Sequence, residues 1–227
     1  MASSKTKADL KVIILGAARV GKTCLIQRYL HGTFESTKAT IGASFFLKHW
    51  DGYHVAIWDT AGEEKYHALS SFYARNASAA ILAYDITDVS SFHSLQKSYL
   101  HLLDAANPKC LCAVVACKSD LVPQHGRNVD VSTAMEFARE HNQSRGAPLP
   151  VGCPNWDSAY FETSSKTGDG VQAVFDFLQR TLLQGMPPAG ESATSLPPSI
   201  AHTLAVVDRD RGSVSANDKE QSKGCCS

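Results

Sequence analysis

Short apolar segments alternate with longer amphipathic ones over the first 185 residues of the chain. The short segments hold four to six mostly aliphatic or aromatic residues between polar or glycine-containing turns, which is typical of buried strands. In the longer segments apolar side chains recur with the period of a helix that buries one face. We therefore expect strands at Leu10–Leu15, Phe45–Trp50, His54–Trp58, Ala79–Tyr84, Cys112–Cys117 and Ala159–Glu162, and helices at Lys22–His31, Ser90–Ala105, Ser132–Asn142 and Val171–Leu183.

The connections between these segments indicate how the strands pair. Residues Trp50-Asp51-Gly52-Tyr53 contain the Asp-Gly pair of a tight hairpin, so the second and third strands should be antiparallel neighbours. Elsewhere strands alternate with helices, which predicts an α/β fold with a six-stranded, mostly parallel sheet and helices on both faces. Residues 144–157 (SRGAPLPVGCPNWD) have no period and contain prolines, so we expect a surface loop there.

The composition changes near residue 185, where the sequence continues as GMPPAGESATSLPPS and then stays polar. A segment so rich in proline, glycine and serine cannot bury enough apolar surface to offset the entropy of ordering it. We therefore expect two parts, a compact domain at residues 1–185 and a flexible tail at residues 186–227.

Charge and cysteine content narrow the function classes. Basic and acidic residues number 22 each, so no overall positive field favours a nucleic-acid partner. The N-terminal segment MASSKTKADL is polar and no run of 18 apolar residues occurs, so we expect neither a signal peptide nor a membrane-spanning helix. The seven cysteines are then expected to be reduced thiols in the cytosol. Cys110 and Cys112 should be buried strand side chains, because a zinc site formed by this pair would lack the C-x₂-C spacing.

The segment after the first strand, GAARVGKT at residues 16–23, matches the phosphate-binding loop pattern G-x-x-x-x-G-K-[ST] between a strand and a helix. Its glycines let the backbone curl so that several N–H groups face one anion, and the following helix adds the positive end of its dipole. The Lys22 ammonium should reach the outer phosphates, and the Thr23 hydroxyl should ligate Mg²⁺. The expected phosphate contacts are Gly16, Ala17, Ala18, Arg19, Val20, Gly21, Lys22, Thr23 and Cys24.

Two further segments are placed to complete a phosphate and metal site. Thr40 lies in a polar loop after the first helix, where its hydroxyl can join the Mg²⁺ shell. Asp59 follows the third strand and can hold a Mg²⁺-bound water, while the Gly62 N–H can meet the terminal phosphate. We therefore expect a metal site formed by Thr23, Thr40 and Asp59.

The choice of base depends on the ends of the last two strands. In the segment Cys117-Lys118-Ser119-Asp120, the Asp120 carboxylate can accept two N–H groups from the Watson–Crick edge of guanine, which adenine does not offer. A backbone N–H of the later loop can donate to the guanine O6. A P-loop kinase or ATPase is another possible interpretation. Asp120 disfavours it, and the sequence contains no arginine-rich lid that would support it. The expected residues of the later loop are Ser164, Ser165 and Lys166.

Together these segments resemble the Ras superfamily of small GTPases over about residues 10–183, and within it a Rab protein. The segments that carry the Rab resemblance are IGASF at 41–45, IWDTAG at 57–62, FYARNA at 72–77 and LAYDIT at 82–87. The resemblance implies a P-loop nucleotide switch that binds GTP or GDP with Mg²⁺, hydrolyses GTP and recruits effectors to membranes in vesicle traffic. It also implies a monomer on the cytosolic face of intracellular membranes.

The same resemblance assigns roles to particular residues and partners. It places Lys22, Gly62 and Glu63 in catalysis, and it places the Phe34 ring against the guanine. It implies an effector surface that interacts with GTP-state effectors. The alternative for its aromatic members is ordinary core packing. The implied partners are an exchange factor, an activating protein, a prenylation escort and a protein of the GDP-dissociation-inhibitor type. The expected effector surface consists of Ile41, Phe45, Trp58 and Tyr73.

The chain ends in Gly224-Cys225-Cys226-Ser227, which resembles the double-prenylation ending of Rab proteins. A C-a-a-X box would need cysteine at position 224. From Met186 onward the tail carries four basic and five acidic side chains, so it has no polybasic anchor. Because one lipid chain gives only marginal membrane binding, we expect both Cys225 and Cys226 to be lipidated.

Three departures from the family pattern predict an altered cycle. Glu63 stands where the family has a catalytic glutamine, and Cys117 stands where it has the asparagine of the base-binding segment. Only five residues separate Phe34 from Thr40, and none of them is a tyrosine that would cover the nucleotide. We expect slow hydrolysis and fast nucleotide exchange. The alternative is a membrane-tethered nucleotide-binding interaction protein with negligible GTP turnover.

Overall fold

The computed structural model describes residues 8–153 and 155–187. It contains a six-stranded sheet in the order β2-β3-β1-β4-β5-β6. The pair β2·β3 is antiparallel and the other four neighbouring pairs are parallel, which confirms the predicted fold class. The strands are β1 (Leu10–Leu15), β2 (Ala43–Trp50), β3 (Tyr53–Thr60), β4 (Ala79–Asp85), β5 (Leu111–Cys117) and β6 (Tyr160–Thr163). The α-helices are α1 (Lys22–His31), α2 (His67–Ala74), α3 (Val89–Ser94), α4 (Val122–His125), α5 (Val131–Arg145) and α6 (Val171–Leu183).

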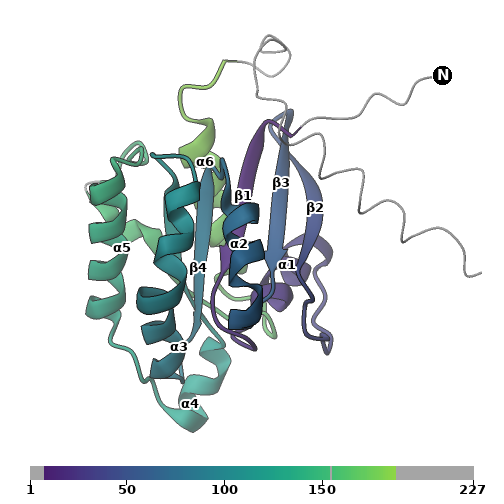
Figure 1. Ribbon diagram of the computed structural model, residues 1–227. Helices are drawn as coiled ribbons and strands as arrows, with labels where there is room; N and C mark the ends of the chain where they lie inside the picture. Colours follow the sequence, from purple (N-terminus) through teal and green to yellow (C-terminus); the bar gives the residue numbers. More distant parts are fainter. Residues whose placement is uncertain (1–7, 154, 188–227) are drawn as a thin grey trace, which may run out of the picture. The chain divides into compact units, whose positions relative to one another are not determined.

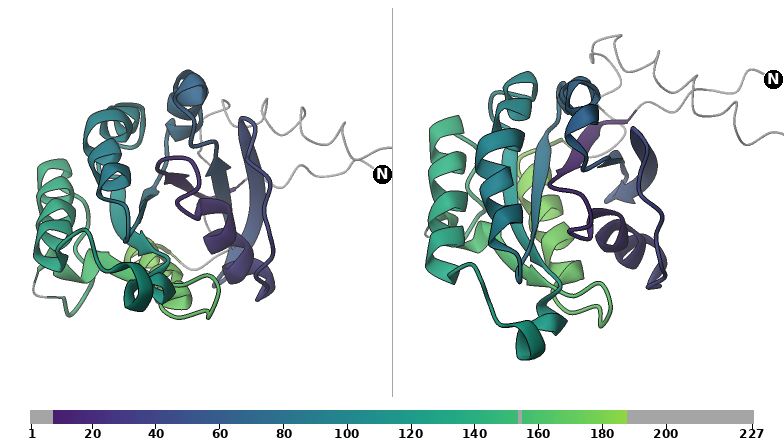
Figure 2. Two further views of the ribbon diagram at one scale, coloured as in Figure 1. Left: turned by 90° about the horizontal axis from the view of Figure 1, so that it is seen from below. Right: turned by 60° about the horizontal axis from the view of Figure 1, so that its bottom comes forward.

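Helices cover both faces of the sheet. In Figure 1, α2 and α3 lie in front of the sheet and α6 lies behind it, and the view from below in Figure 2 separates the two helix layers. Helices α1 and α6 pack against each other on one face. Every residue of β1, β4 and β5 is buried, which explains why these strands are nearly continuous apolar runs rather than alternating ones.

The β2–β3 hairpin forms as predicted. Trp50 pairs with Tyr53, and the two turn residues between them both have positive φ angles, 46° for Asp51 and 87° for Gly52. Positive φ at both central positions is the type I′ geometry that Asp-Gly favours, because glycine adopts it without steric strain. The strands extend further than predicted, since β2 begins at Ala43 and β3 at Tyr53.

The helix predicted at Ser90–Ala105 is not regular. It begins as α3, continues as a π-helical turn at Leu95–Tyr99 (η2), and ends as a 3₁₀ segment at Leu100–Ala105 (η3). Periodicity alone does not distinguish these helix types. Helix α2 was not predicted, because an eight-residue segment is too short to show a clear period.

The predicted surface loop at residues 144–157 is shorter than expected. Ser144 and Arg145 belong to α5, which ends at Arg145 and is capped by Gly146 with a φ angle of 57°. At the other end Trp156 is buried and opens a short 3₁₀ segment. An aromatic side chain near the end of the segment therefore ties the loop to the core, a role that its proline-rich composition did not indicate.

Two further expectations concern cysteines and membranes. Cys110 and Cys112 are both buried, as predicted. Within the described residues, no group of three or more His, Cys, Asp or Glu side chains is arranged to hold a metal ion. No helix in the described part of the chain is long and apolar enough to cross a membrane. The predicted tail lies outside the described residues from position 188 onward, and so do Cys225 and Cys226.

Candidate nucleotide-binding site

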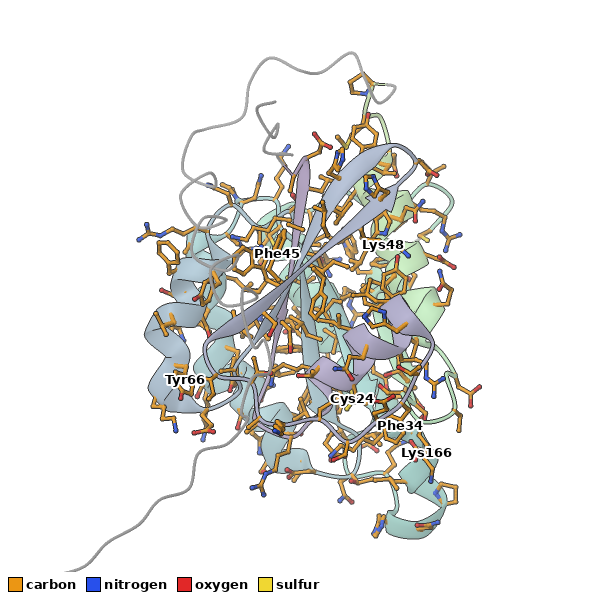
Figure 3. The ribbon with its side chains drawn as sticks, turned by 90° about the vertical axis from the view of Figure 1, so that its right-hand side faces the viewer. Cys24, Phe34, Phe45, Lys48, Tyr66 and Lys166 are labelled. Carbon is orange, nitrogen blue, oxygen red and sulfur yellow. The ribbon has the colours of Figure 1, made fainter. Side chains whose placement is uncertain are left out.

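The loops that follow the carboxyl ends of the parallel strands meet at one edge of the sheet and enclose a cavity of about 710 Å³. Ligand sites of open α/β sheets form at this edge. Cys24, Phe34 and Lys166 come from three distant segments and lie together there in Figure 3. The cavity is lined by Ala18, Arg19, Gly21, Lys22, Thr23, Cys24, Phe34, Thr37, Lys38, Ala39, Thr40, Thr60, Gly62, Glu63, Cys117, Lys118, Asp120, Leu121, Ser165 and Lys166.

The loop between β1 and α1 has the geometry of a phosphate cradle. Gly16 has a φ angle of 147°, and a Cβ there would lie 2.1 Å from the Ala83 carbonyl oxygen, so only glycine fits. The Lys22 ammonium folds back over the loop and donates to the carbonyl oxygens of Gly16 and Ala17, each at 2.8 Å. Burial lowers the pKa of Lys22 to about 8, although the nearby Asp59 carboxylate raises it. This buried cation faces an enclosed loop, which suits an anionic ligand.

Not every predicted member of this loop lines the cavity. Val20 is 2% exposed, and its side chain belongs to the hydrophobic core. The phosphate contact predicted for Val20 therefore stays a prediction for its backbone N–H, because the valine side chain packs into the core. The carbonyl oxygens of Gly16 and Ala17 accept from Lys22, and the phosphate contacts predicted for these two residues stay predictions.

Gly62 packs directly against the phosphate loop. A Cβ at this position would lie 2.4 Å from the Ala18 nitrogen and 2.5 Å from the Lys22 Nζ. Any side chain at residue 62 would therefore displace the loop or the ammonium. This contact places the backbone of residue 62 beside the cradle, where the sequence predicts its N–H to meet a terminal phosphate.

The three predicted metal-site residues form one cluster. The Thr23 hydroxyl donates to Asp59 Oδ2 at 2.7 Å, the Thr40 hydroxyl donates to the same oxygen at 3.1 Å, and the two hydroxyl oxygens are 3.0 Å apart. Asp59 is fully buried and its Oδ1 has no hydrogen-bond partner among the described residues. Burial raises the pKa of Asp59, and hydrogen bonds from Thr23 only partly oppose this. Two hydroxyls and a buried carboxylate with a spare oxygen fit a small hard cation such as Mg²⁺.

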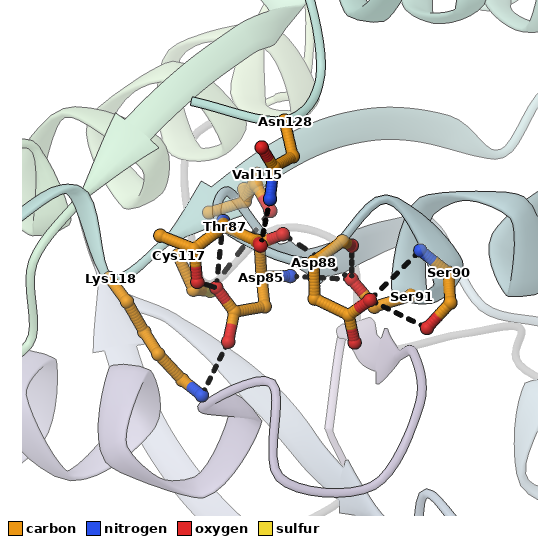
Figure 4. Close-up of polar contacts among 9 residues, drawn as sticks. All are labelled: Asp85, Thr87, Asp88, Ser90, Ser91, Val115, Cys117, Lys118 and Asn128. Atoms are coloured by element: carbon orange, nitrogen blue, oxygen red, sulfur yellow. Dashed lines mark hydrogen bonds and ion pairs between the residues drawn. The ribbon is translucent and has the colours of Figure 1, made fainter. Parts of the chain in front are cut away.

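The base end of the cavity combines Lys118 and Asp120. Lys118 has a left-handed backbone with φ of 66°, and its ammonium donates to Asp85 Oδ2 at 2.6 Å (Figure 4). Burial raises the pKa of Asp85, but the hydrogen bonds from Lys118 and Thr87 outweigh burial and lower it overall. The Asp120 carboxylate accepts a hydrogen bond from the Ser164 hydroxyl at 2.7 Å. Asp120 is thereby oriented with its other oxygen available to a ligand.

Ser164 has a different role from the predicted one. Its backbone N–H donates to the Asp169 carbonyl oxygen at 3.0 Å and is not free for a base. Its hydroxyl orients Asp120, whereas Ser165 and Lys166 line the cavity. The predicted direct contact from Ser164 is therefore corrected, because the turn at residues 164–169 uses this N–H internally.

Cys117 lies between the base end and the phosphate loop. It is 2% exposed, and burial raises the pKa of its thiol to about 12. A Cβ added to Gly21 would lie 3.6 Å from the Cys117 Cβ, so the end of β5 and the phosphate loop are in contact. The thiol makes a weak contact of 4.0 Å with the Val115 carbonyl oxygen. A neutral thiol at this junction links the two segments poorly.

Sequence reasoning missed several residues that support the cavity. Arg28 of α1 donates from Nε to the Ser165 carbonyl oxygen at 2.5 Å and from a terminal nitrogen to that of Lys166 at 2.6 Å. It therefore ties α1 to the base loop, and an arginine on a helix carries no sequence signal for that role. The additional cavity-lining residues are Thr37, Lys38, Ala39, Thr60 and Leu121.

Glu63 lines the cavity beside Gly62. Its Oε2 lies 2.6 Å from the Lys65 ammonium, and both side chains are exposed to solvent, at 42% and 63%. Solvent screens such a pair strongly. The ion pair with Lys65 is therefore too weak to hold the Glu63 carboxylate away from the cavity.

The four residues predicted as an effector surface divide between surface and core. Phe45, Trp58 and Tyr73 form one aromatic cluster, with ring centroids 5.3 Å apart for Phe45 and Trp58 and 5.1 Å apart for Trp58 and Tyr73. Ile41 is 81% exposed, whereas Trp58 is only 4% exposed. The surface position predicted for Trp58 is therefore wrong, because its ring packs beneath the other two.

Comparison with known proteins agrees with this geometry. The model of the Ras family matches residues 11–184. The Ras-related protein Rab-20 of Homo sapiens is 36% identical over 196 residues, which cover 76% of this chain and 83% of the relative. The Ras-related protein Rab-24 of Dictyostelium discoideum is 36% identical over 78% of this chain and 85% of its own length, and RABF2b of Arabidopsis thaliana is 31% identical over the full length of both chains. The chain therefore belongs to the Ras family as a divergent Rab-type small GTPase, which binds GTP or GDP together with Mg²⁺.

Proposed function

We propose that the chain is a prenyl-anchored switch of vesicle traffic that binds GTP, hydrolyses it slowly, exchanges its nucleotide easily and recruits effectors in the GTP state. Membership of the Rab-type GTPases supports the GTP-binding switch and the GTPase activity in general. The observation that carries the proposal is the cavity in which the buried Lys22 ammonium, the Thr23–Asp59–Thr40 cluster and Asp120 converge. These groups match the charges of a nucleoside triphosphate.

The chain's own residues bind and orient the phosphates in this proposal. The Lys22 ammonium exchanges its carbonyl partners for phosphate oxygens, and the backbone of the loop supplies N–H donors. When bound, Mg²⁺ neutralises charge that develops on the phosphate oxygens. Thr23, Thr40 and Asp59 would hold the ion, since they already share one carboxylate oxygen.

Base selection rests on Asp120. A carboxylate accepts two N–H groups of guanine, and the Ser164 hydroxyl fixes its orientation. Adenine would leave this carboxylate unpaired in a partly enclosed site, which is a strong basis for rejection. Lys118, held by Asp85, can lie against the base, and the exposed Phe34 ring also lines the cavity.

Single-turnover phosphate release tests the proposed hydrolysis. The protein is loaded with GTP, and phosphate release is followed after addition of Mg²⁺. We expect slow but measurable release. No release over the lifetime of the complex would instead support the alternative of an interaction protein with negligible turnover, which the Glu63 carboxylate in the cavity favours.

We predict that Cys117→Asn slows GDP release. An asparagine amide both donates and accepts, so it can join the base segment to the adjacent phosphate loop where a thiol does so weakly. One or two buried hydrogen bonds correspond to about 1–3 kcal/mol, or about 5- to 150-fold in the dissociation rate. The measurement is dissociation of a fluorescent GDP analogue, with Cys153→Asn as the control. An unchanged rate for Cys117→Asn would refute the proposed cause of fast exchange.

Anchoring to the cytosolic face of intracellular membranes is proposed to depend on prenyl groups on Cys225 and Cys226. The tail offers no polybasic patch as a second signal. We predict that the double variant Cys225→Ser, Cys226→Ser leaves the membrane fraction and keeps normal nucleotide binding. Fractionation of cells that express the variant, with Cys153→Ser as the control, measures this. Persistent membrane pelleting would point to another anchor, such as the apolar run at 200–207.

The proposed partners follow from this cycle. An exchange factor, an activating protein and effectors belong to Rab-type GTPases in general, and effectors are proposed to contact Ile41 and the aromatic cluster of Phe45 and Tyr73. A prenylation escort and a protein of the GDP-dissociation-inhibitor type are proposed because a doubly prenylated tail needs a carrier in water.

A further inference from the structure

A buried tyrosine links the π-helical turn after α3 to the loop that follows β3. Tyr99 is 1% exposed, and its hydroxyl donates to the Gly62 carbonyl oxygen at 2.7 Å. The two residues are 37 positions apart in the sequence. A tyrosine hydroxyl buried at this depth normally has a partner, and here the partner is the backbone of a residue beside the phosphate cradle.

The irregular helix is what presents this side chain. The N–H of Leu100 donates to the Leu95 carbonyl oxygen, a bond that spans five residues instead of four. The extra residue shifts the side-chain positions that follow it, and both Leu95 and Tyr99 are buried at the ends of the turn. Such π-helical turns occur frequently at functional sites. The π-helical turn therefore places the Tyr99 side chain where its hydroxyl reaches Gly62, whereas a regular helix would direct residue 99 differently.

The hydrogen bond fixes the orientation of one peptide group. The carbonyl of Gly62 points to Tyr99, and in a trans peptide the following N–H, that of Glu63, points the opposite way. On its other side Gly62 is within van der Waals contact of the phosphate loop, because a Cβ there would collide with Ala18 and the Lys22 ammonium. Gly62 is thus held between Tyr99 and the phosphate cradle.

We propose that Tyr99 is a positioning residue that holds Gly62 against the phosphate cradle and thereby favours binding of a nucleotide with a terminal phosphate. This inference rests on the proposed function, because it concerns how the site distinguishes GTP from GDP. Because the Gly62 backbone is already restrained, binding of the terminal phosphate costs less conformational entropy. Loss of the hydroxyl leaves the Gly62 carbonyl without this donor and releases the loop, whereas contacts to the base and the inner phosphates are unaffected.

The test compares Tyr99→Phe with wild-type protein in affinity for a non-hydrolysable GTP analogue and for GDP. We expect the affinity for the GTP analogue to fall about 3- to 10-fold, while the affinity for GDP changes less than about twofold. The control is Tyr53→Phe, which removes another buried hydroxyl, one that has no hydrogen-bond partner among the described residues and lies in the β2–β3 hairpin. Equal losses for both nucleotides, or no loss, would overturn the role of Tyr99.

A measurement on the wild-type protein tests the same hydrogen bond if Tyr99→Phe does not fold. In protein labelled with ¹³C at the backbone carbonyls, we expect the Gly62 carbonyl to show the downfield shift of a hydrogen-bonded carbonyl group in both nucleotide states, and the shift of a carbonyl without a donor would overturn the proposal. Failure of the proposed function would look different, since wild-type protein would then bind neither guanine nucleotide.

Discussion

Replacement of Lys22 by asparagine is expected to abolish stable GTP binding, and Thr23→Asn is expected to have the same consequence. Lys22 is the cation buried in the phosphate cradle, with its ammonium at hydrogen-bond distance from two loop carbonyls. Two charge-assisted hydrogen bonds to phosphate correspond to about 3–6 kcal/mol, which is more than about 100-fold in affinity. Thr23→Asn removes the hydroxyl that donates to Asp59 and so disturbs the metal cluster.

Equilibrium dialysis with GTP and Mg²⁺ measures this loss. Lys109→Asn is a matched control, because Lys109 is an exposed lysine in the turn before β5. Circular dichroism shows whether the variants keep the fold. A folded Thr23→Asn protein that holds GTP and Mg²⁺ as the wild type does would show that the cluster of Thr23, Thr40 and Asp59 is not the metal site.

Glu63→Gln is expected to raise the hydrolysis rate that an activating protein stimulates by at least about tenfold. In the proposed cycle the side chain at residue 63 orients the attacking water. A carboxylate there accepts a proton more readily than an amide, but it repels the anionic phosphate and offers no N–H donor. At about 5 Å and an effective dielectric of about 20, the repulsion is on the order of 3 kcal/mol before screening. Because an activating protein excludes water, we expect the repulsion and the lost donor to dominate.

The ion pair of Glu63 with Lys65 does not change this expectation. Both side chains are exposed, so solvent screens the pair and the carboxylate can leave it. The measurement is single-turnover hydrolysis of wild-type and Glu63→Gln protein, each alone and with a Rab-directed activating domain. Glu136→Gln is the control, because it removes an exposed carboxylate on α5. An unchanged stimulated rate would mean that the charge at residue 63 does not limit the cycle.

The sequence predicted those parts of the site that depend on local pattern. The loop at residues 16–23 needs glycines, a lysine and a threonine at fixed spacing. Thr40 and Asp59 are distant from Thr23 in the sequence, but their places after a helix and after a strand were enough to predict that the three side chains lie together. The hairpin turn at Asp51 and Gly52 formed as well, because its geometry is a property of two residues. Such patterns can be recognised in a sequence because the backbone geometry or the chemistry requires a particular residue type at each position.

The parts that escaped prediction depend on tertiary contacts. The π-helical turn and the bond of Tyr99 to Gly62 follow from packing between segments far apart in the sequence. The burial of Trp58 depends on which rings cover its strand. Ser164 supports Asp120 because the following turn uses its backbone N–H, and no spacing rule distinguishes that role from direct contact with a base. Side-chain direction and the internal use of backbone groups are properties of the folded chain.

Competition between nucleotides tests the central claim most directly. The protein is purified with Mg²⁺, its bound nucleotide is identified by chromatography, and displacement by GTP, GDP and ATP is measured, with and without a chelator. We expect bound GDP or GTP, release on removal of Mg²⁺, and no displacement by ATP at about 1,000-fold excess, because the proposed site pairs Asp120 with guanine. Bound adenine nucleotide, or displacement by ATP at concentrations close to those of GTP, would contradict it.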